Sequence, residues 1–158
     1  LRIAAPTDGA IKMSGEDIRN YDILSYRDLF GVVSQDVYLF NSGIKDNICL
    51  DRNISQKRLD NVIEMVNLKE LVDERGIDYN VGENGSKISM GQKQKIALAR
   101  AIIISKPFII LDEATSNLDV DTIETVTKLF DTELKNSTVI CVTHTEQVAR
   151  FFNNVINL

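Results

Sequence analysis

The stretch Pro107-Phe108-Ile109-Ile110-Leu111-Asp112-Glu113 combines a short apolar, β-branched run with two acidic residues. A run of this length next to a proline is typical of a buried strand in a parallel sheet. The two acids mark the point where the chain leaves the sheet. We therefore expect a strand over Phe108–Leu111 whose carboxyl end carries Asp112 and Glu113.

Two similar runs flank this strand in the sequence. Phe30–Val33 is apolar and β-branched, with Gln35 just past its end, and Thr138–Thr143 is β-branched and ends at His144. Near the start, Ala10–Met13 predicts a short strand that turns at Ser14-Gly15.

Helical spacing fills the segments between these strands. The predicted helices are one capped by Ser55, a short one over Lys69–Glu74, one from Gln92 to about Ser105, one capped by Asp119 or Asp121, and the tail of one over Leu1–Ala5 before Pro6. Strands alternating with helices predict an α/β fold, with a mainly parallel sheet covered by helices on both faces.

The three predicted strands all stop at residues suited to phosphate chemistry. Ligands of open parallel sheets bind beyond the carboxyl ends of the strands, so these residues are expected to gather there. Asp112 is suited to hold Mg²⁺ and Glu113 to accept a proton from an attacking water. Gln35 is suited to orient that water or sense the γ-phosphate, and His144 to donate to the γ-phosphate. Taken singly, each residue also fits a solvated turn or an ordinary surface position.

The segment Ile88-Ser89-Met90-Gly91-Gln92 leads a glycine-containing loop into the predicted helix that starts at Gln92. The start of a helix presents unpaired N–H groups and a positive dipole end, which together favour an anion. Ser89 adds a hydroxyl group, and Gly91 allows close approach to the backbone. A capped helix without any ligand is the alternative.

Five segments, in this order, resemble the motifs of the ATPase domain of ABC transporters. They are Val33–Asp36 with Leu39-Phe40 (Q-loop), Ile88–Gln92 with its helix (signature motif), Phe108–Glu113 (Walker B), Ser116–Asp119 (D-loop) and Thr143-His144 (switch histidine). Phe40–Ile48 and Val81–Gly85 look most like exporters. The resemblance implies a P-loop NTPase-like ABC core over residues 1–158, with core parts at 1–40 and 106–158 and a helical subdomain at 41–105.

The resemblance also implies roles and partners. Glu113, His144 and Gln35 are the implied catalytic residues, and Asp112 with Gln35 the implied Mg²⁺ ligands. Ser89, Gly91, Gln92 and Asp119 are the implied contacts to ATP across a head-to-tail dimer of two such domains. The implied partners are this second domain and a transmembrane domain, and the implied location is the cytoplasmic side of the cell membrane.

Two features depart from the family pattern. Met90 stands where the signature motif usually has glycine, so we expect weakened, dimer-dependent hydrolysis. No stretch matches the phosphate-binding loop G-x-x-x-x-G-K-[ST], and the resemblance places that loop upstream of Leu1. We therefore expect an N-terminally truncated domain that alone binds ATP poorly and exposes apolar surface.

Bulk properties exclude other classes. The 158 residues carry a formal net charge of −5 without a basic stripe, which argues against nucleic acid as a partner. No apolar run is long enough to span a bilayer. The spacing of Cys49 and Cys141 fits neither a metal site nor a disulfide framework, so two buried thiols are expected.

A degenerate, non-catalytic ABC-like interaction module remains the competing interpretation.

Overall fold

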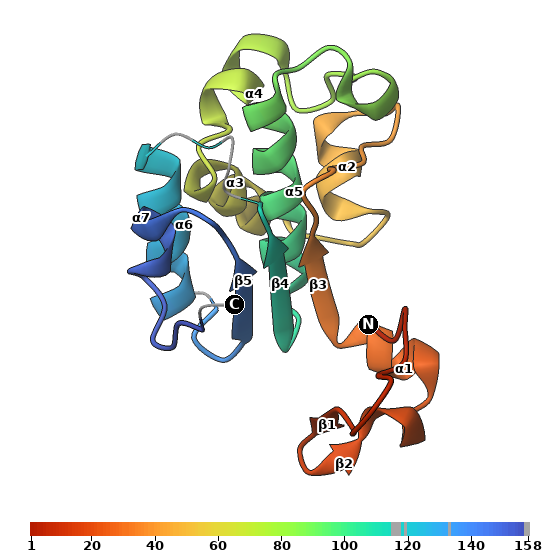
Figure 1. Ribbon diagram of the computed structural model, residues 1–158. Coiled ribbons are helices and arrows are strands. Elements are labelled where there is room, and N and C mark those ends of the chain that lie inside the picture. The colour runs from red at the N-terminus through yellow and green to blue at the C-terminus, as the bar shows by residue number, and fades with distance from the viewer. Residues whose placement is uncertain (115–117, 119, 133, 157–158) are drawn as a thin grey trace.

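Three parallel strands, in the spatial order β3-β4-β5, form the main sheet of the molecule (Figure 1). They are β3 (Phe30–Val33), β4 (Phe108–Asp112) and β5 (Thr138–Val142). The structure is a computed structural model, and it describes residues 1–114, 118, 120–132 and 134–156. The three strands match the predicted runs, and their pairing confirms a mainly parallel sheet flanked by helices.

Most of the helices lie between β3 and β4 in the sequence. The helices are α1 (Ile23–Asp28), α2 (Ile44–Cys49), α3 (Gln56–Met65), α4 (Lys69–Arg75), α5 (Met90–Ile104), α6 (Val120–Asp131) and α7 (Glu146–Ala149), with two 3₁₀ turns at Ile18–Asn20 and Glu83–Gly85. Ser55 caps α3 as predicted, because its side chain accepts a hydrogen bond from the backbone N–H of Arg58.

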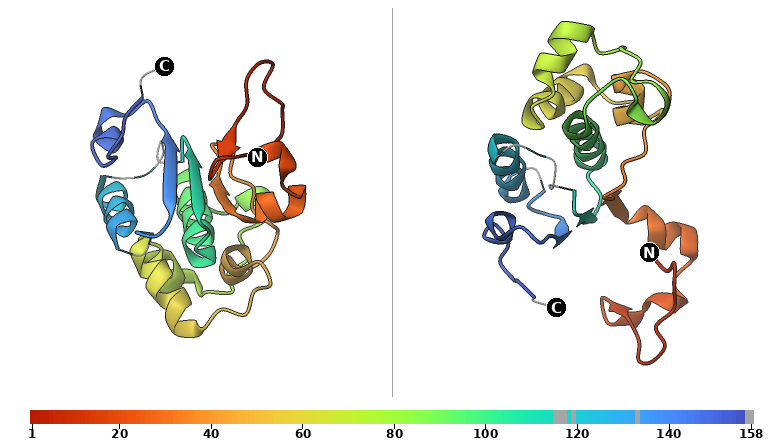
Figure 2. Two further views of the ribbon diagram at one scale, coloured as in Figure 1. Left: turned by 90° about the horizontal axis from the view of Figure 1, so that it is seen from below. Right: turned by 45° about the horizontal axis from the view of Figure 1, so that its top comes forward.

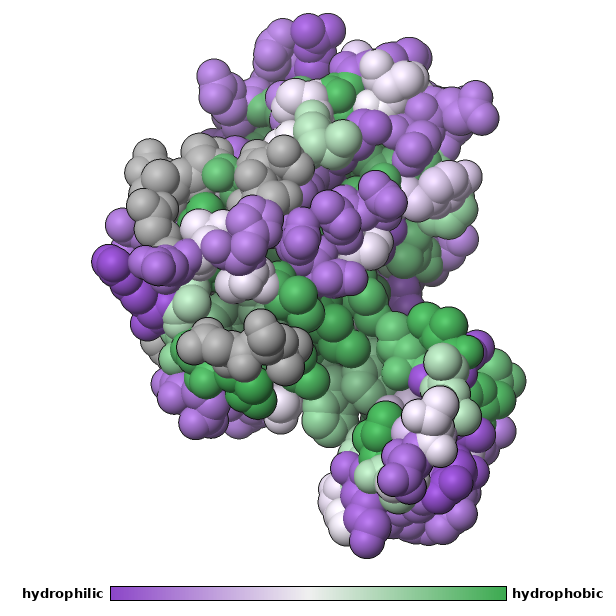
Figure 3. Space-filling model, viewed as in Figure 1, coloured by the Kyte–Doolittle hydropathy of each residue, from purple (hydrophilic) through white to green (hydrophobic). Residues whose placement is uncertain are grey.

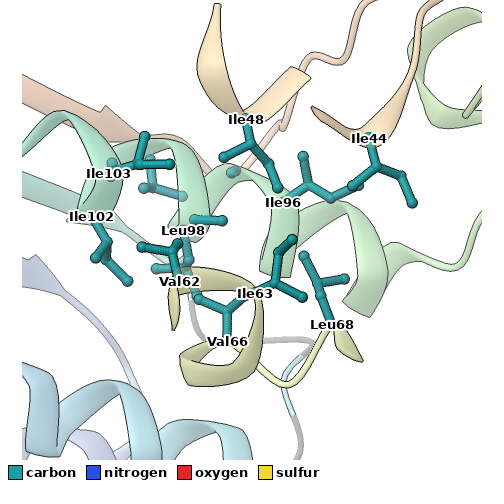
Figure 4. Close-up of a cluster of buried hydrophobic side chains, with 14 of the residues drawn as sticks. Ile44, Ile48, Val62, Ile63, Val66, Leu68, Ile96, Leu98, Ile102 and Ile103 are labelled. Atoms are coloured by element: carbon teal, nitrogen blue, oxygen red, sulfur yellow. The ribbon is translucent and has the colours of Figure 1, made fainter. Parts of the chain in front are cut away.

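The core is centred on α5, which packs against α2, α3 and β3 (Figure 4). Ile44 and Ile48 of α2 and Val62 and Ile63 of α3 are buried against this helix. Leu59, Val62, Ile63 and Val66, which lie on one face at helical spacing, are all buried. The core thus joins the segment after β3 to the helix that leads into β4.

Close approach of α5 to the sheet depends on small residues. A Cβ atom added at Gly31 of β3 would lie 3.1 Å from Cδ1 of Ile109 and 3.9 Å from Cβ of Ala101 on α5. A side chain at this position would have to displace the end of the Ile109 side chain, and one longer than a methyl group would also meet Ala101 of α5.

Helices cover one face of the sheet, whereas the prediction was that they would cover both. Val33, Ile109 and Leu111 point to the helical side and are buried. The opposite row is Val32, Ile110 and Ile140, which are paired in register, and Val32 and Ile140 are 43% and 49% exposed. Apolar side chains gather over this part of the surface in Figure 3. The prediction of two covered faces was wrong because no segment of the described chain packs over that row.

The N-terminal segment projects from the rest of the molecule (Figures 1 and 2). It contains a hairpin of β1 (Lys12–Met13) and β2 (Glu16–Asp17), which turns at Ser14-Gly15 as predicted. Leu1–Ala5 is not helical, so that prediction was wrong. In a helix of five residues, the entropic cost of ordering the backbone exceeds the stabilisation from the few helical hydrogen bonds that can form. Arg2 has a left-handed φ of 54° and donates instead to the carbonyl of Tyr21.

Candidate active site

Gln35, Glu113 and His144 come together beyond the carboxyl end of the sheet. Val33, Leu111 and Cys141 are partners in register on the three strands. On each strand, the polar residue comes two or three positions after the residue that is paired in register. Because the strands are parallel, the three polar residues lie at the same edge of the sheet. The gathering predicted from the strand ends therefore occurs in the structure.

The carboxylate of Glu113 lies between the other two side chains. Nε2 of Gln35 donates a hydrogen bond of 2.9 Å to Oε2 of Glu113. Nδ1 of His144 lies 3.8 Å from Oε1 of Glu113, beyond hydrogen-bond distance. The Glu113 side chain is 32% exposed and that of His144 72% exposed, so a water molecule or a phosphate can reach both.

The backbone at the end of β4 helps to place Glu113. Its N–H donates to the carbonyl of Val142 at 3.0 Å, which extends the pairing with β5 by one residue. Its φ of 48° lies in the left-handed region that non-glycine residues rarely adopt. At Glu113 the backbone therefore turns away from the direction of the strand. Asp112 is the last residue of β4.

Asp112 supplies an exposed carboxylate beside Glu113. The Asp112 carboxylate and the amide oxygen of Gln35 are both hard oxygen donors of the kind that Mg²⁺ prefers. Within the described ranges, no group of three or more His, Cys, Asp or Glu residues is placed to hold a metal. This donor set fits a Mg²⁺ ion that takes its remaining ligands from water and from nucleotide phosphates, as such ions usually do.

Ser89 caps α5, and the segment around it is held by its own side chains. The hydroxyl of Ser89 accepts from the N–H of Gln92 at 3.2 Å, and Oε1 of Gln92 accepts from the N–H of Ser89 at 2.9 Å. This reciprocal capping starts α5 at Met90, two residues earlier than predicted. Met90 is 52% exposed, and Gly91 follows it in the first turn.

The remaining predicted contact to ATP cannot be placed. Asp119 and residues 115–117 lie outside the described residues, so the structure gives no geometry for the segment that resembles the D-loop. Ser89, Gly91 and Gln92 lie at the start of α5, in the part of the molecule formed by helices α2 to α5 (Figure 1).

Two asparagines, which sequence reasoning missed, connect the segment after Gln35 to α2 and to the loop before α5. Asn47 of α2 is fully buried, and its side chain accepts from the N–H of Phe40 at 2.8 Å. Its amide nitrogen donates to the carbonyls of Phe40 and Gly43. In addition, Oδ1 of Asn84 accepts from the N–H of Leu39 at 3.3 Å, which links this segment to the loop before α5.

Arg100 on α5 completes this connection. Its guanidinium donates to the carbonyl of Asn47 at 2.9 Å and to that of Tyr38 at 3.2 Å. Burial lowers the pKa of Arg100 below its usual value. The signal in the sequence was a cation inside the apolar run Ala97–Ile104, a position that a buried hydrogen-bonding role explains.

Comparison with known proteins identifies the family. The family model described as ABC transporter matches residues 1–116, which is most of the chain. The chain belongs to the ABC transporter family.

Relatives support the exporter type within the ABC transporter family. The chain is 38% identical over 140 residues to an ATP-dependent lipid A-core flippase of Vibrio vulnificus (strain CMCP6), covering 86% of this chain and 24% of the flippase. It is 36% identical over 141 residues to the flippase of the same description from Escherichia coli (strain K12), covering 87% of this chain and 24% of that protein.

A solved structure with the same fold agrees. A bacterial Atm1-family ABC exporter with ATP bound superposes with a TM-score of 0.85 at 32% identity, covering 92% of this chain and 26% of that one. These matches confirm the predicted exporter-type ABC ATPase domain. The chain spans about a quarter of the length of the relatives it matches. None of its described helices is long and apolar enough to cross a membrane.

Proposed function

We propose that this chain is the ATP-hydrolysing part of an ABC exporter that drives a substrate across a membrane. The observation that supports the proposal most directly is the cluster of Gln35, Glu113 and His144. These residues follow three parallel strands and lie together beyond the carboxyl end of the sheet. Carboxylate, amide and imidazole groups at such an edge suit the transfer of a phosphoryl group to water.

Each residue of the cluster has a role of its own in this proposal. Glu113 accepts the proton of the attacking water, and its partial exposure supports this role. His144, more exposed, donates to the γ-phosphate. Asp112 and the amide oxygen of Gln35 hold Mg²⁺, which neutralises charge on the phosphates when bound.

The start of α5 acts on a second nucleotide. We propose that Ser89, Gly91, Gln92 and Asp119 contact ATP held by a partner domain in a head-to-tail dimer. The N-terminal end of a fifteen-residue helix capped by Ser89 supports an anion at this position.

The proposal divides the molecule into two parts. Residues 1–40 and 106–158 form the nucleotide-binding core, and residues 41–105 a helical subdomain that meets a transmembrane domain. The segregation of α2 to α5 between β3 and β4 supports this division. The domain would work at the cytoplasmic side of the cell membrane.

We propose further that these 158 residues alone bind ATP weakly, because none of them forms a G-x-x-x-x-G-K-[ST] loop around the phosphates. The test compares this chain with a version lengthened at its N-terminus by the residues that its gene encodes before Leu1. Binding of Mg²⁺-ATP is measured by calorimetry and hydrolysis by phosphate release. We expect binding and turnover only in the lengthened version. Saturable micromolar binding by the 158 residues would contradict the proposal.

A degenerate, non-catalytic module is the second candidate. Met90 in the signature segment favours it. The gene decides between the candidates, because an in-frame phosphate loop before Leu1 supports the motor, whereas a start codon near Leu1 supports the module.

A further inference from the structure

The side chain of Gln35 presents a defined end to Glu113. Its nitrogen, Nε2, donates to Oε2 of Glu113 at 2.9 Å. A carboxylate only accepts hydrogen bonds, so this contact fixes which end of the amide faces Glu113. The amide oxygen, Oε1, therefore lies at the end turned away from the carboxylate. An amide oxygen in such a position can act as a ligand for a cation.

Gln35 and His144 differ in how firmly they hold Glu113. The contact with Gln35 is a hydrogen bond of 2.9 Å between its amide nitrogen and a carboxylate oxygen. The contact with His144 spans 3.8 Å and involves a side chain that is 72% exposed. Of these two side chains, Gln35 is thus the one that fixes the direction of the carboxylate.

We propose that Gln35 is a positioning residue for Glu113 as well as a ligand for Mg²⁺. The donor end of one amide would orient the carboxylate that accepts the water proton, and its acceptor end would be available to hold Mg²⁺. The orientation of the base is thereby tied to the position of the cation. This inference rests on the proposed function of Glu113. It predicts that an oxygen ligand alone at position 35 is not sufficient for hydrolysis.

The contact itself is tested without any nucleotide. The chain labelled with ¹⁵N-glutamine is compared with its Glu113→Ala variant by NMR of the side-chain amides. An internal reference exists on α3, where Nε2 of Gln56 donates to Oδ1 of Asp60 at 2.7 Å. We expect Glu113→Ala to shift the amide signals of Gln35 and to leave those of Gln56, and Asp60→Ala to do the reverse. Gln35 signals that do not respond to Glu113→Ala would overturn the inference.

The consequence is tested in the full polypeptide that the gene encodes. Gln35→Glu keeps an oxygen ligand but removes the donor and sets two carboxylates against each other. We expect hydrolysis at saturating Mg²⁺-ATP to fall about tenfold or more, with no rise in the Mg²⁺ concentration for half-saturation. Gln35→Met lacks both the amide N–H donor and the amide oxygen. We expect it to lower hydrolysis and also to raise the Mg²⁺ concentration for half-saturation.

Controls separate the possible failures. Gln56→Glu makes the same chemical change at an exposed site outside the cluster and is expected to leave both quantities unchanged. If Gln35→Glu hydrolyses ATP within about twofold of wild type, the positioning role is wrong. If the wild-type polypeptide does not hydrolyse ATP, the proposed function fails, and the amide signals still decide whether Gln35 holds Glu113.

Discussion

Met90 is the residue at which the chain departs most clearly from the signature pattern. Its side chain is exposed in the first turn of α5, directly after the capping serine. Met90 is the first residue of α5, next to the helix N-terminus, whose N–H groups favour an anion. The residue is well placed to crowd a phosphate there.

Replacing Met90 with glycine should therefore raise the rate of ATP hydrolysis. We expect an increase of about twofold to tenfold for Met90→Gly in the lengthened domain, since up to ~1.4 kcal/mol of barrier would be removed. The measurement is phosphate release at saturating ATP and at several protein concentrations, because the effect depends on dimerisation. An unchanged or lower rate would count against the crowding.

Asn47 is the buried residue on which the segment after Gln35 depends most. Its side chain has no exposed surface. It accepts a hydrogen bond from the N–H of Phe40 and donates one to the carbonyl of Phe40. Leucine has nearly the same volume but cannot form hydrogen bonds. Substitution would leave the N–H and the carbonyl of Phe40 without this partner.

Asn47→Leu is expected to lower the free energy of unfolding by about 3 kcal/mol. Chemical denaturation followed by circular dichroism provides the measurement. Asn61→Leu serves as the control, because Asn61 lies exposed on α3 and should change stability by less than about 0.5 kcal/mol. Equal effects of the two substitutions would show that the buried hydrogen bonds contribute little.

Among the elements, strands were predicted well and short helices poorly. β3, β4 and β5 could be predicted because each is a short apolar run followed by a polar residue. The helices α1, α2 and α7, of six, six and four residues, are too short for a hydrophobic period to stand out. For example, α2 exists because Ile44 and Ile48 bury themselves against α5, which is a tertiary effect.

The same distinction holds at the candidate site. The gathering of Gln35, Glu113 and His144 followed from parallel strands that end at polar residues. The hydrogen bond between Gln35 and Glu113 did not, because it depends on the left-handed turn at Glu113 and on the path of the chain after β3. Nor could the role of Asn47 be seen, since a single asparagine carries no periodic signal.

Strand β5 carries a thiol whose titration affects stability. Burial raises the pKa of Cys141 to about 11, whereas the thiol has its ordinary pKa in the unfolded chain. The folded state therefore keeps the proton to higher pH than the unfolded state. The resulting stabilisation is complete below the ordinary thiol pKa and is lost as pH rises towards about 11.

Unfolding experiments between about pH 8.5 and pH 11 test this titration. We expect the free energy of unfolding to fall across this range and Cys141→Ala to reduce the slope. Cys49, whose pKa burial also raises, remains in both proteins as a common background. The same slope with and without Cys141 would show that its thiol titrates alike in the folded and unfolded chains.

At the scale of the whole molecule, the main consequence of the architecture is a face of the sheet that none of the described segments covers. Val32, Ile110 and Ile140 form an apolar row in register, and the first and last of them are well exposed. Exposed apolar patches of this kind favour association between molecules.

The 158-residue chain is therefore expected to self-associate through this face. Sedimentation velocity should show species larger than a monomer at about 10–100 μM, a range in which exposed apolar surface commonly drives association. The double variant Val32→Lys and Ile140→Lys should shift the distribution towards monomer. Val155→Lys is the control, because it changes an exposed apolar residue outside the row. A monomeric wild-type chain would contradict the expectation.

The most direct measurement replaces the carboxylate on which the proposed chemistry depends. Glu113→Gln in the full polypeptide keeps the size of the side chain but removes its ability to take a proton. Hydrolysis and binding of Mg²⁺-ATP are measured on the same preparation. We expect hydrolysis to fall at least ~100-fold while the affinity for ATP stays within about threefold. Hydrolysis by the Glu113→Gln variant at close to the wild-type rate would contradict it.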